Sequence, residues 1–246
     1  MRDYQKEYEG RVAFIRDLVA SSGVRGIVFG NSGGKDSALV GILCKAACDD
    51  TVGVIMPCAS TRNYGSDRDD GNALAEQFGI ETRTVDLTAA REAAAAAIGE
   101  AVSINDASLA NIAPRLRMIT LYTIAGSEGR LVAGTGNRSE TYMGYFTKWG
   151  DGACDFNPIS DLTATEVIEF LDHLDAPLSI RRKAPSAGLF EGQTDEQEMG
   201  VTYAAIDRYI TTGEATPEDK AVIDRFHSRS EHKRRPAVTY TPREEL

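Results

Sequence analysis

The stretch Gly26-Ile-Val-Phe-Gly-Asn-Ser-Gly-Gly-Lys-Asp-Ser37 decides which fold this chain adopts. Its first five residues, Gly26 to Gly30, are a short apolar run that is typical of a buried strand. A tight glycine-containing loop follows, and the segment after it predicts a helix through Cys48. Backbone amides and the helix dipole make such a junction suitable for binding an anion. We therefore expect a phosphate-binding loop at the carboxyl end of the first strand.

The alternation of strand and helix continues along the first 133 residues. Further strands are expected at Thr51–Met56, Glu81–Leu87 and Arg130–Ala133, and helices at about 4–21, 72–78, 89–98 and 116–125. This order predicts an α/β fold with a parallel, Rossmann-like sheet, whose ligands lie beyond the carboxyl ends of the strands. The functional edge should therefore be made by the loops that follow Phe29, Met56, Leu87 and Ala133.

Beyond about residue 147 the pattern changes. Two long irregular segments, 147–160 and 176–198, have the length of functional loops or lids. Between them Thr163-Ala-Thr-Glu166 is a capping box that should open a helix reaching His173. Helices are also expected at about 201–210 and 217–226. We expect one domain, residues 1–246, with a helical C-terminal extension.

Composition excludes several classes of protein. The formal net charge of −10 argues against nonspecific nucleic-acid binding, which requires cations to replace counterions. No apolar run approaches 18 residues, so no membrane-spanning helix is expected, and the charged N-terminus does not resemble a signal peptide. Four cysteines without CxxC spacing and three histidines give no pattern for a Cys or His metal site. A cytoplasmic protein is expected.

The glycine loop does not match the two common nucleotide-binding patterns. A Walker A loop requires Ser or Thr after its lysine, whereas Asp36 follows Lys35 here, and the pattern GxGxxG is also unmatched. Asp36 would repel phosphate unless Mg²⁺ lay between them, which indicates a metal–nucleotide complex. From these residues alone, a plain glycine turn with an aspartate at the start of the helix remains an alternative.

Ser32-Gly33-Gly34, Asp36 and Ser37 resemble the pyrophosphate loop of N-type ATP pyrophosphatases, which cleave ATP to AMP and pyrophosphate. Further blocks, in order along nearly the whole chain, resemble NAD synthetases. These blocks are Gly134-Thr-Gly-Asn-Arg-Ser-Glu140, Gly144-Tyr-Phe-Thr-Lys-Trp-Gly-Asp-Gly152, Asn157-Pro158, Asp161-Leu162, Pro185-Ser-Ala-Gly-Leu189, Gly192-Gln-Thr-Asp-Glu196 and Glu231-His-Lys-Arg234. The resemblance implies a three-layer, adenine nucleotide alpha hydrolase-like domain.

The resemblance also implies roles for individual residues. It places at ATP Gly30, Asn31, Ser32, Gly33, Gly34, Lys35, Asp36, Ser37, Thr135 and Ser186. It places at the acid substrate, deamido-NAD, Arg115, Lys148, Asp155, His232 and Lys233. It gives Mg²⁺ the ligands Asp36 and Glu140, and it makes Asp36, Lys148 and Asp151 the catalytic group.

The implied reaction is the amidation of deamido-NAD by ammonia, through an acyl-adenylate, with release of AMP and pyrophosphate. A homodimer is implied as well. Glutamine-using relatives need a second catalytic domain, for which this length leaves no room, so the ammonia is expected to be free or to come from a separate protein. A pyrophosphatase that acts on a different carboxylate and a nucleotide-binding module without turnover remain alternatives.

Two positions depart from the pattern of the family. Lys35 stands where an apolar residue is usual, and Ala164 stands where a lysine is usual at ATP. We hypothesise that Lys35 supplies the missing positive charge from the other side of the phosphates.

Overall fold

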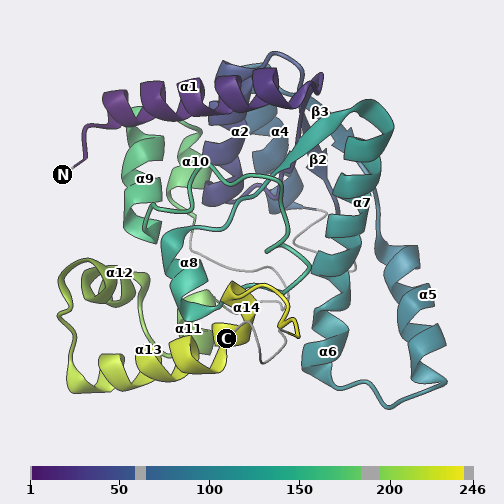
Figure 1. Ribbon diagram of the computed structural model, residues 1–246, viewed down its shortest axis with the longest axis vertical. Coiled ribbons are helices and arrows are strands. Elements are labelled where there is room, and N and C mark those ends of the chain that lie inside the picture. The colour runs from purple at the N-terminus through teal and green to yellow at the C-terminus, as the bar shows by residue number, and fades with distance from the viewer. Residues whose placement is uncertain (1, 59–64, 184–193, 241–246) are drawn as a thin grey trace.

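The computed structural model describes residues 2–58, 65–183 and 194–240. At its centre is a parallel sheet of four strands in the order β3-β2-β1-β4 (Figure 1). The strands are β1 (Gly26–Gly30), β2 (Thr51–Ile55), β3 (Glu81–Thr84) and β4 (Arg130–Ala133). The parallel α/β sheet expected from the sequence is confirmed.

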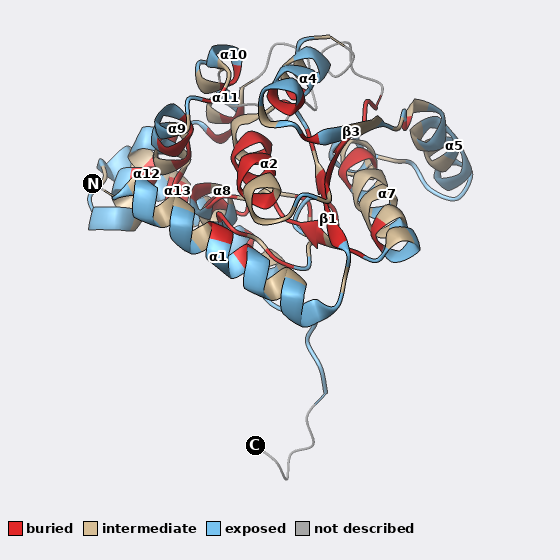
Figure 2. Cartoon of the chain, turned by 90° about the horizontal axis from the view of Figure 1, so that it is seen from above, coloured by how far each residue is buried: buried red, intermediate tan, exposed pale blue. Residues whose placement is uncertain are grey.

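Helices cover both faces of this sheet, which gives the three layers (Figure 2). One face packs against α1 (Tyr4–Ser22), α2 (Lys35–Ala47), α4 (Ser66–Phe78), α9 (Ala164–His173) and α10 (Leu178–Arg181). The other face packs against α7 (Ile112–Glu128), and α5 (Thr88–Gly99) lies outside α7.

Side chains of β1 alternate between the two halves of the core. Ile27 and Phe29 belong to the half that contains α1 and α2, whereas Val28 belongs to the half that contains α7. The Phe29 ring lies against two glycines: a Cβ added at Gly41 would come within 2.6 Å of the ring, and one at Gly53 within 3.1 Å. These glycines let α2 and β2 approach β1 closely.

The helical C-terminal extension builds a third cluster of buried residues beside the carboxyl edge of the sheet. The extension contributes α11 (Asp195–Met199), α12 (Tyr203–Thr212), α13 (Pro217–Arg229) and α14 (Glu231–Arg234), which lie next to α8 (Arg138–Met143). Met143, Ile206 and Ile223 are fully buried there. This extension therefore packs around α8, directly next to the segment that follows β4.

Observed elements differ from the expected ones mainly in short segments. The third strand ends at Thr84, although the amides of Val85 and Leu87 still donate to Ile55 and Pro57 carbonyls. Among the described residues, several helices of four to six residues were not expected, because such short segments show no periodicity. They are α6 (Asp106–Ala110), α8, α10, α11 and α14. The predicted capping box opens α9 with both of its hydrogen bonds. Within the described ranges no helix has the length and apolarity needed to span a membrane.

Candidate active site

The loop between β1 and α2 is held in one conformation by its own side chains. Gly33 has φ +69°, and a Cβ there would lie 2.0 Å from the Asp67 carbonyl oxygen, so only glycine fits. The Asn31 amide donates to the Gly71 carbonyl at 2.9 Å, and the hydroxyls of Ser32 and Ser37 are 2.9 Å apart. The loop is thus fixed by its own side chains immediately before the start of α2, where the Gly33 and Gly34 amides also donate to the Asn31 and Ser32 side chains.

A cavity of about 1110 Å³ opens at the carboxyl edge of the sheet, as the parallel topology requires. It is lined by the residues that follow three strands: Gly30, Asn31, Ser32, Gly34, Lys35, Asp36 and Ser37 after β1, Met56 and Pro57 after β2, and Gly134, Thr135, Gly136 and Asn137 after β4. The loop after β3 does not contribute, so three of the four predicted loops meet here. The volume suits a nucleotide together with part of a second substrate.

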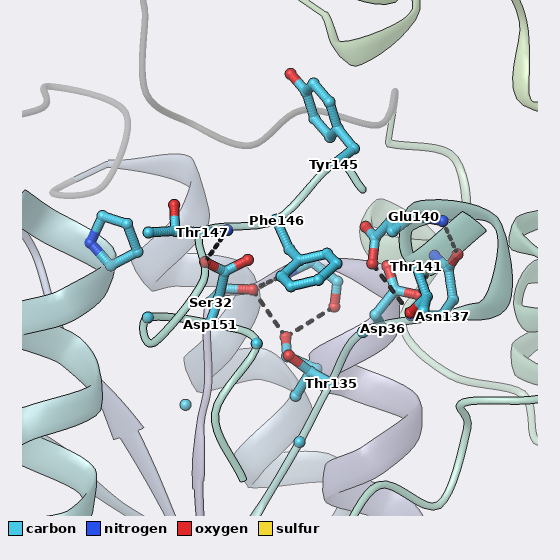
Figure 3. Close-up of a pocket in the computed structure, with 18 of the residues that line it drawn as sticks. Ser32, Asp36, Thr135, Asn137, Glu140, Thr141, Tyr145, Phe146, Thr147 and Asp151 are labelled. Atoms are coloured by element: carbon cyan, nitrogen blue, oxygen red, sulfur yellow. Dashed lines mark hydrogen bonds between the residues drawn. The ribbon is translucent and has the colours of Figure 1, made fainter. Parts of the chain in front are cut away.

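Two carboxylates lie on one side of this cavity, bridged by an amide (Figure 3). The Asn137 side-chain Nδ2 donates to Oδ1 of Asp36 at 2.9 Å, and the Asn137 backbone amide donates to Oε2 of Glu140 at 3.1 Å. The Asn137 Oδ1 in turn accepts from the Glu140 backbone amide at 2.9 Å. Burial raises the pKa of both carboxyls, and their mutual repulsion raises the pKa of Glu140 further. Such a pair needs a proton or a cation to offset its charge.

This donor set fits a hard cation that shares its coordination with a nucleotide. No group of three His, Cys, Asp or Glu side chains that could hold a metal is found in the part of the chain that the structure describes. Mg²⁺ commonly takes one or two carboxylates and completes its shell with water and substrate phosphates. Asp36 and Glu140, beside the glycine loop, offer that pair.

The opposite side of the cavity is formed by a loop that follows α8. In this loop Asp151 accepts a 2.9 Å hydrogen bond from the Thr147 amide, and burial raises the pKa of the Asp151 carboxyl (Figure 3). Lys233 supports the loop from α14: its Nζ donates to the carbonyls of Gly144 at 2.8 Å and Phe146 at 2.7 Å. Burial lowers the pKa of Lys233.

Two further lysines line the cavity near the glycine loop. Lys35, at the start of α2, is half-buried, and burial lowers the pKa of its amine despite the nearby carboxylates. Lys183 pairs with Asp67 at 2.7 Å and Asp70 at 2.6 Å and donates to the Gly33 carbonyl at 3.2 Å. Lys183 is therefore paired with carboxylates of the protein itself, whereas the Lys35 amine forms no hydrogen bond or ion pair with a residue that the structure describes.

Comparison with known proteins agrees with this geometry. The family model described as NAD synthase matches residues 7–237. The chain belongs to the NAD synthase family. The NH(3)-dependent NAD(+) synthetase of Carboxydothermus hydrogenoformans is 43 % identical over 236 residues, which are 95 % of this chain and 96 % of that protein.

Two solved structures place the fold within the same NAD synthase family. The NMN synthetase of Francisella tularensis has a TM-score of 0.92 and 37 % identity, over 98 % of this chain and 99 % of that one. The NH3-dependent NAD synthetase of Campylobacter jejuni has a TM-score of 0.79 and 27 % identity, over 98 % and 100 % of the two chains.

The structure brings together most, but not all, of the residues that the family resemblance had placed at a site. Of the predicted ATP residues, Gly33 lies in the same loop against the Asp67 backbone without lining the cavity, and Ser186 lies outside the described residues. The others line the cavity. Glu140, Asp151 and Lys233 also line it.

The remaining predicted substrate residues lie beside the cavity. A guanidinium nitrogen of Arg115 donates to the Lys148 carbonyl at 3.3 Å, and the Lys148 Nζ donates to the His232 carbonyl at 2.6 Å. Asp155 is tied to β4, where its carboxylate accepts from the Val132 amide at 2.8 Å. Arg115, Lys148 and His232 thus form one connected rim, with Lys148 on the same loop as Asp151.

Three residues with clear structural roles at the site were not predicted. Asn137 bridges the two carboxylates, and its signal was present as the capping box Asn137–Glu140. Lys183 anchors the glycine loop. Asp207 of α12 accepts from the Ser139 hydroxyl at 2.5 Å and from the Thr165 amide at 2.8 Å, so it fastens α8 to α9. No local pattern pointed to Lys183 or Asp207.

Proposed function

We propose that this chain amidates the nicotinate carboxyl group of deamido-NAD with ammonia, using ATP and releasing AMP and pyrophosphate. One observation carries the proposal: the Asp36 and Glu140 carboxylates, which accept from the side-chain and backbone amides of Asn137, lie beside a glycine loop in a chain of the NAD synthase family. The name of the Carboxydothermus relative, NH(3)-dependent NAD(+) synthetase, supports the same reaction.

A carboxylate is too poor an electrophile for ammonia and must first be activated. In the first step a carboxylate oxygen attacks the α-phosphorus of ATP. An acyl–O–P bond forms as the bond between the α-phosphorus and the bridging oxygen breaks, and pyrophosphate leaves. Catalysis of such a step is mostly alignment together with stabilisation of the phosphate charge.

The chain's own groups are arranged for that step. The amides at the start of α2, the hydroxyls of Ser32 and Ser37 and the Lys35 amine would hold the phosphates. Asp36 and Glu140 would hold Mg²⁺, which offsets phosphate charge when it is bound. Asn137 keeps the Asp36 carboxylate oriented toward the cavity.

In the second step ammonia attacks the carbonyl carbon of the mixed anhydride, AMP leaves, and the nitrogen loses a proton. Asp151 is our candidate for the group that takes up this proton, because burial raises the pKa of its carboxyl and it lines the cavity. The Thr147 amide orients it. The loop that carries Asp151 would also exclude water, which would otherwise hydrolyse the anhydride.

One assay tests the proposal and its alternatives together. The protein is incubated with Mg-ATP, ammonium and deamido-NAD, and the amounts of NAD, AMP and pyrophosphate formed are measured. The proposal predicts that the three products form in equal amounts. Pyrophosphate without NAD would favour a different carboxylate substrate. Absence of all three products would favour a nucleotide-binding module without turnover.

A second candidate substrate has a specific observation in its favour. The Francisella NMN synthetase matches this chain with a TM-score of 0.92, against 0.79 for the Campylobacter NAD synthetase. The acid form of that product is nicotinate mononucleotide, which presents the same carboxyl group without the adenylate half. The kcat/KM for the mononucleotide and for deamido-NAD, measured side by side, decides between them.

We also propose a homodimer and a cytoplasmic location. α5 has no buried residue, and Ile98, Val102 and Ile119 on or next to α5 and α7 are each about half exposed, as a subunit interface would require. Sedimentation velocity on the purified protein tests the dimer. All four cysteines are free, which suits a reducing compartment.

A further inference from the structure

Trp149 is the one tryptophan of this chain, and its side chain is unusually open to solvent. It is 58 % exposed, on the loop that carries Thr147 and Asp151. Tryptophan usually gains stability from burying its large apolar surface. Single exposed apolar residues are nevertheless common on proteins, so exposure alone carries no conclusion.

The backbone at Trp149 provides a second, independent observation. Its φ is +60°, at the third position of a turn that the Gly150 amide closes by donating to the Thr147 carbonyl at 2.9 Å. Glycine or asparagine normally takes that position, because a bulky side chain is strained there. Strained bulky residues concentrate at sites where a ligand is held.

The surrounding loop holds this conformation firmly. The Thr147 amide donates to Asp151, and the Thr147 hydroxyl donates to the Asn111 side chain at 2.6 Å. Gly150 packs so closely that a Cβ there would lie 3.0 Å from Thr147 and 3.1 Å from Pro114. The indole is therefore presented by a fixed turn rather than by a freely moving one.

One cation lies over the indole, with its amine hydrogen-bonded to the His232 carbonyl, and a second is hydrogen-bonded to the residue before Trp149. The Lys148 Nζ lies 5.4 Å from the centre of the indole ring, and Arg115 donates to the Lys148 carbonyl. Neither cation forms an ion pair with a carboxylate in the described part of the chain. Aromatic surface beside free positive charge is complementary to a flat heteroaromatic ring that carries carboxylate or phosphate groups.

We infer that Trp149 is a substrate-binding residue whose indole stacks on a flat heteroaromatic ring of the acid substrate, while Lys148 and Arg115 face that substrate's anionic groups. This rests on the proposed function, since the nicotinate nucleotide supplies both the ring and the charges. The ring is the pyridine in either candidate substrate, or the adenine, which only the dinucleotide carries. The strain at Trp149 then places the indole where ligand, rather than protein, covers it.

Because the chain has a single tryptophan, its fluorescence reports directly on this residue. Deamido-NAD and nicotinate mononucleotide are each titrated into the protein without ATP. Saturable quenching by both supports stacking on the pyridine ring, and quenching by deamido-NAD alone supports stacking on adenine. No saturable change with either substrate, or a change that follows dilution of the protein instead, overturns the inference and makes Trp149 a surface or subunit-contact residue.

Variants separate binding from folding. Trp149→Gly should raise the KM for the acid substrate about tenfold while the KM for ATP stays unchanged, since ring stacking is lost. Its thermal midpoint should equal or exceed that of the parent, because glycine relieves the strained φ. Trp149→Tyr should restore most of the lost affinity. Leu178→Ala, which removes a comparably exposed apolar side chain on α10, is the control and should change neither KM.

A Trp149→Gly protein with an unchanged KM for the acid substrate contradicts the inference, whether or not its thermal midpoint is lowered. Failure of the proposed function looks different: the parent protein itself would make no NAD or NMN. The fluorescence titration does not depend on turnover, so in that case it still measures whether the acid substrate binds at Trp149.

Discussion

Asn137 and Asp36 are joined by a hydrogen bond of 2.9 Å between the amide Nδ2 and the carboxylate Oδ1, across a sequence separation of 101 residues. The same Asn137 caps α8 through its side-chain oxygen. One side chain thus fixes where α8, which carries Glu140, lies relative to the start of α2. Two carboxylates are held together in this way although each raises the cost of ionising the other.

The free-energy cost of ionising two neighbouring buried carboxyl groups predicts how the stability of the protein depends on pH in the absence of metal. The ordinary pKa values are 3.8 for Asp36 and 4.5 for Glu140, and burial together with repulsion raises both in the folded protein. The folded state therefore binds these protons more tightly than the unfolded chain. Stability is fully present below the ordinary values and is lost as pH rises through the raised ones.

Glu140→Gln removes one of the two charges, so at pH 7 in EDTA it should unfold at a higher temperature than the parent. The shift should be roughly 2–4 °C for each kcal/mol of repulsion removed, and it should vanish near pH 4. Circular dichroism melts from pH 4 to 8 measure it. Glu92→Gln, the same change at an exposed position of α5, should have no such effect. A lower midpoint for Glu140→Gln at pH 7 would refute the argument.

Lys35 provides the second prediction. Its amine lines the cavity beside the glycine loop, and Ala164 lines the same cavity. If Lys35 holds the phosphates, Lys35→Ala loses a charge-assisted hydrogen bond of about 1.5–3 kcal/mol, which raises the KM for ATP roughly 10- to 150-fold. Steady-state kinetics with varied ATP measure it.

Two further variants complete that experiment. Lys45→Ala removes a lysine from the last turn of the same helix, away from the cavity, and should leave the KM for ATP unchanged. Adding a cation in the Lys35→Ala background through Ala164→Lys should lower the KM again. Unchanged ATP kinetics in Lys35→Ala would show that the Lys35 amine contacts solvent and does not bind the phosphates of ATP.

The elements that were predictable from the sequence are those whose signal is local. The apolar runs Gly26–Gly30 and Arg130–Ala133 are strands with the expected bounds, because burial on both faces of a parallel sheet selects continuous apolar residues. The glycine loop was predictable because Gly33 must adopt a positive φ beside the Asp67 carbonyl. Apolar runs and glycines can therefore be interpreted from the sequence, because each reflects a requirement on a few neighbouring residues.

The supports of the site were not predictable, because they depend on which distant groups the fold brings together. Lys233 donates to two backbone carbonyls almost 90 residues earlier, and a carbonyl has no sequence signature. Lys183 meets Asp67 and Asp70 only after α4 and α10 pack near the glycine loop. A long cationic side chain in a sequence does not reveal whether it will hold a ligand or the protein itself.

Arg130 gives a prediction for the opposite edge of the sheet. Its side chain is 1 % exposed and pairs with Asp50 at 2.8 Å and Glu128 at 2.7 Å. Arg130→Ala should cost about 2–3 kcal/mol of unfolding free energy, less than a fully buried pair because both partners are partly exposed. Urea unfolding at pH 7 measures it, and kcat should be unchanged because the cavity lies at the other end of β4.

The same cluster predicts behaviour in acid. Hydrogen bonds from Arg83 and Arg130 lower the pKa of Glu128 to about 2. This contribution to stability is present above the ordinary value of 4.5 and is lost as pH falls toward 2. Arg130→Ala should therefore lose less stability than the parent between pH 4.5 and 2. Equal losses in the two proteins would count against a role for Arg130 in holding the Glu128 charge.

Asp207 supports the last prediction. Its buried carboxylate accepts from the Ser139 hydroxyl and the Thr165 amide, and Ser139 is the neighbour of Glu140 on α8. Asp207→Ala leaves buried donors without an acceptor, which should cost about 2–3 kcal/mol of unfolding free energy. Because α8 then loses one of its ties to α9 and keeps the hydrogen bond from the Ala164 amide to the Ser139 hydroxyl, the Mg²⁺ concentration for half-maximal activity should also rise several-fold.

Asp207→Asn, which keeps one oxygen acceptor, should lie between Asp207→Ala and the parent in both measurements. Asp224→Ala is the matched control: it removes a half-exposed carboxylate of α13 that pairs, among the described residues, with Lys220 and Tyr209, and both measurements should stay at parental values. Urea unfolding and Mg²⁺ titration of activity are made on the same preparations. A loss of stability in Asp207→Ala with an unchanged Mg²⁺ requirement would mean that Asp207 holds the fold without positioning Glu140.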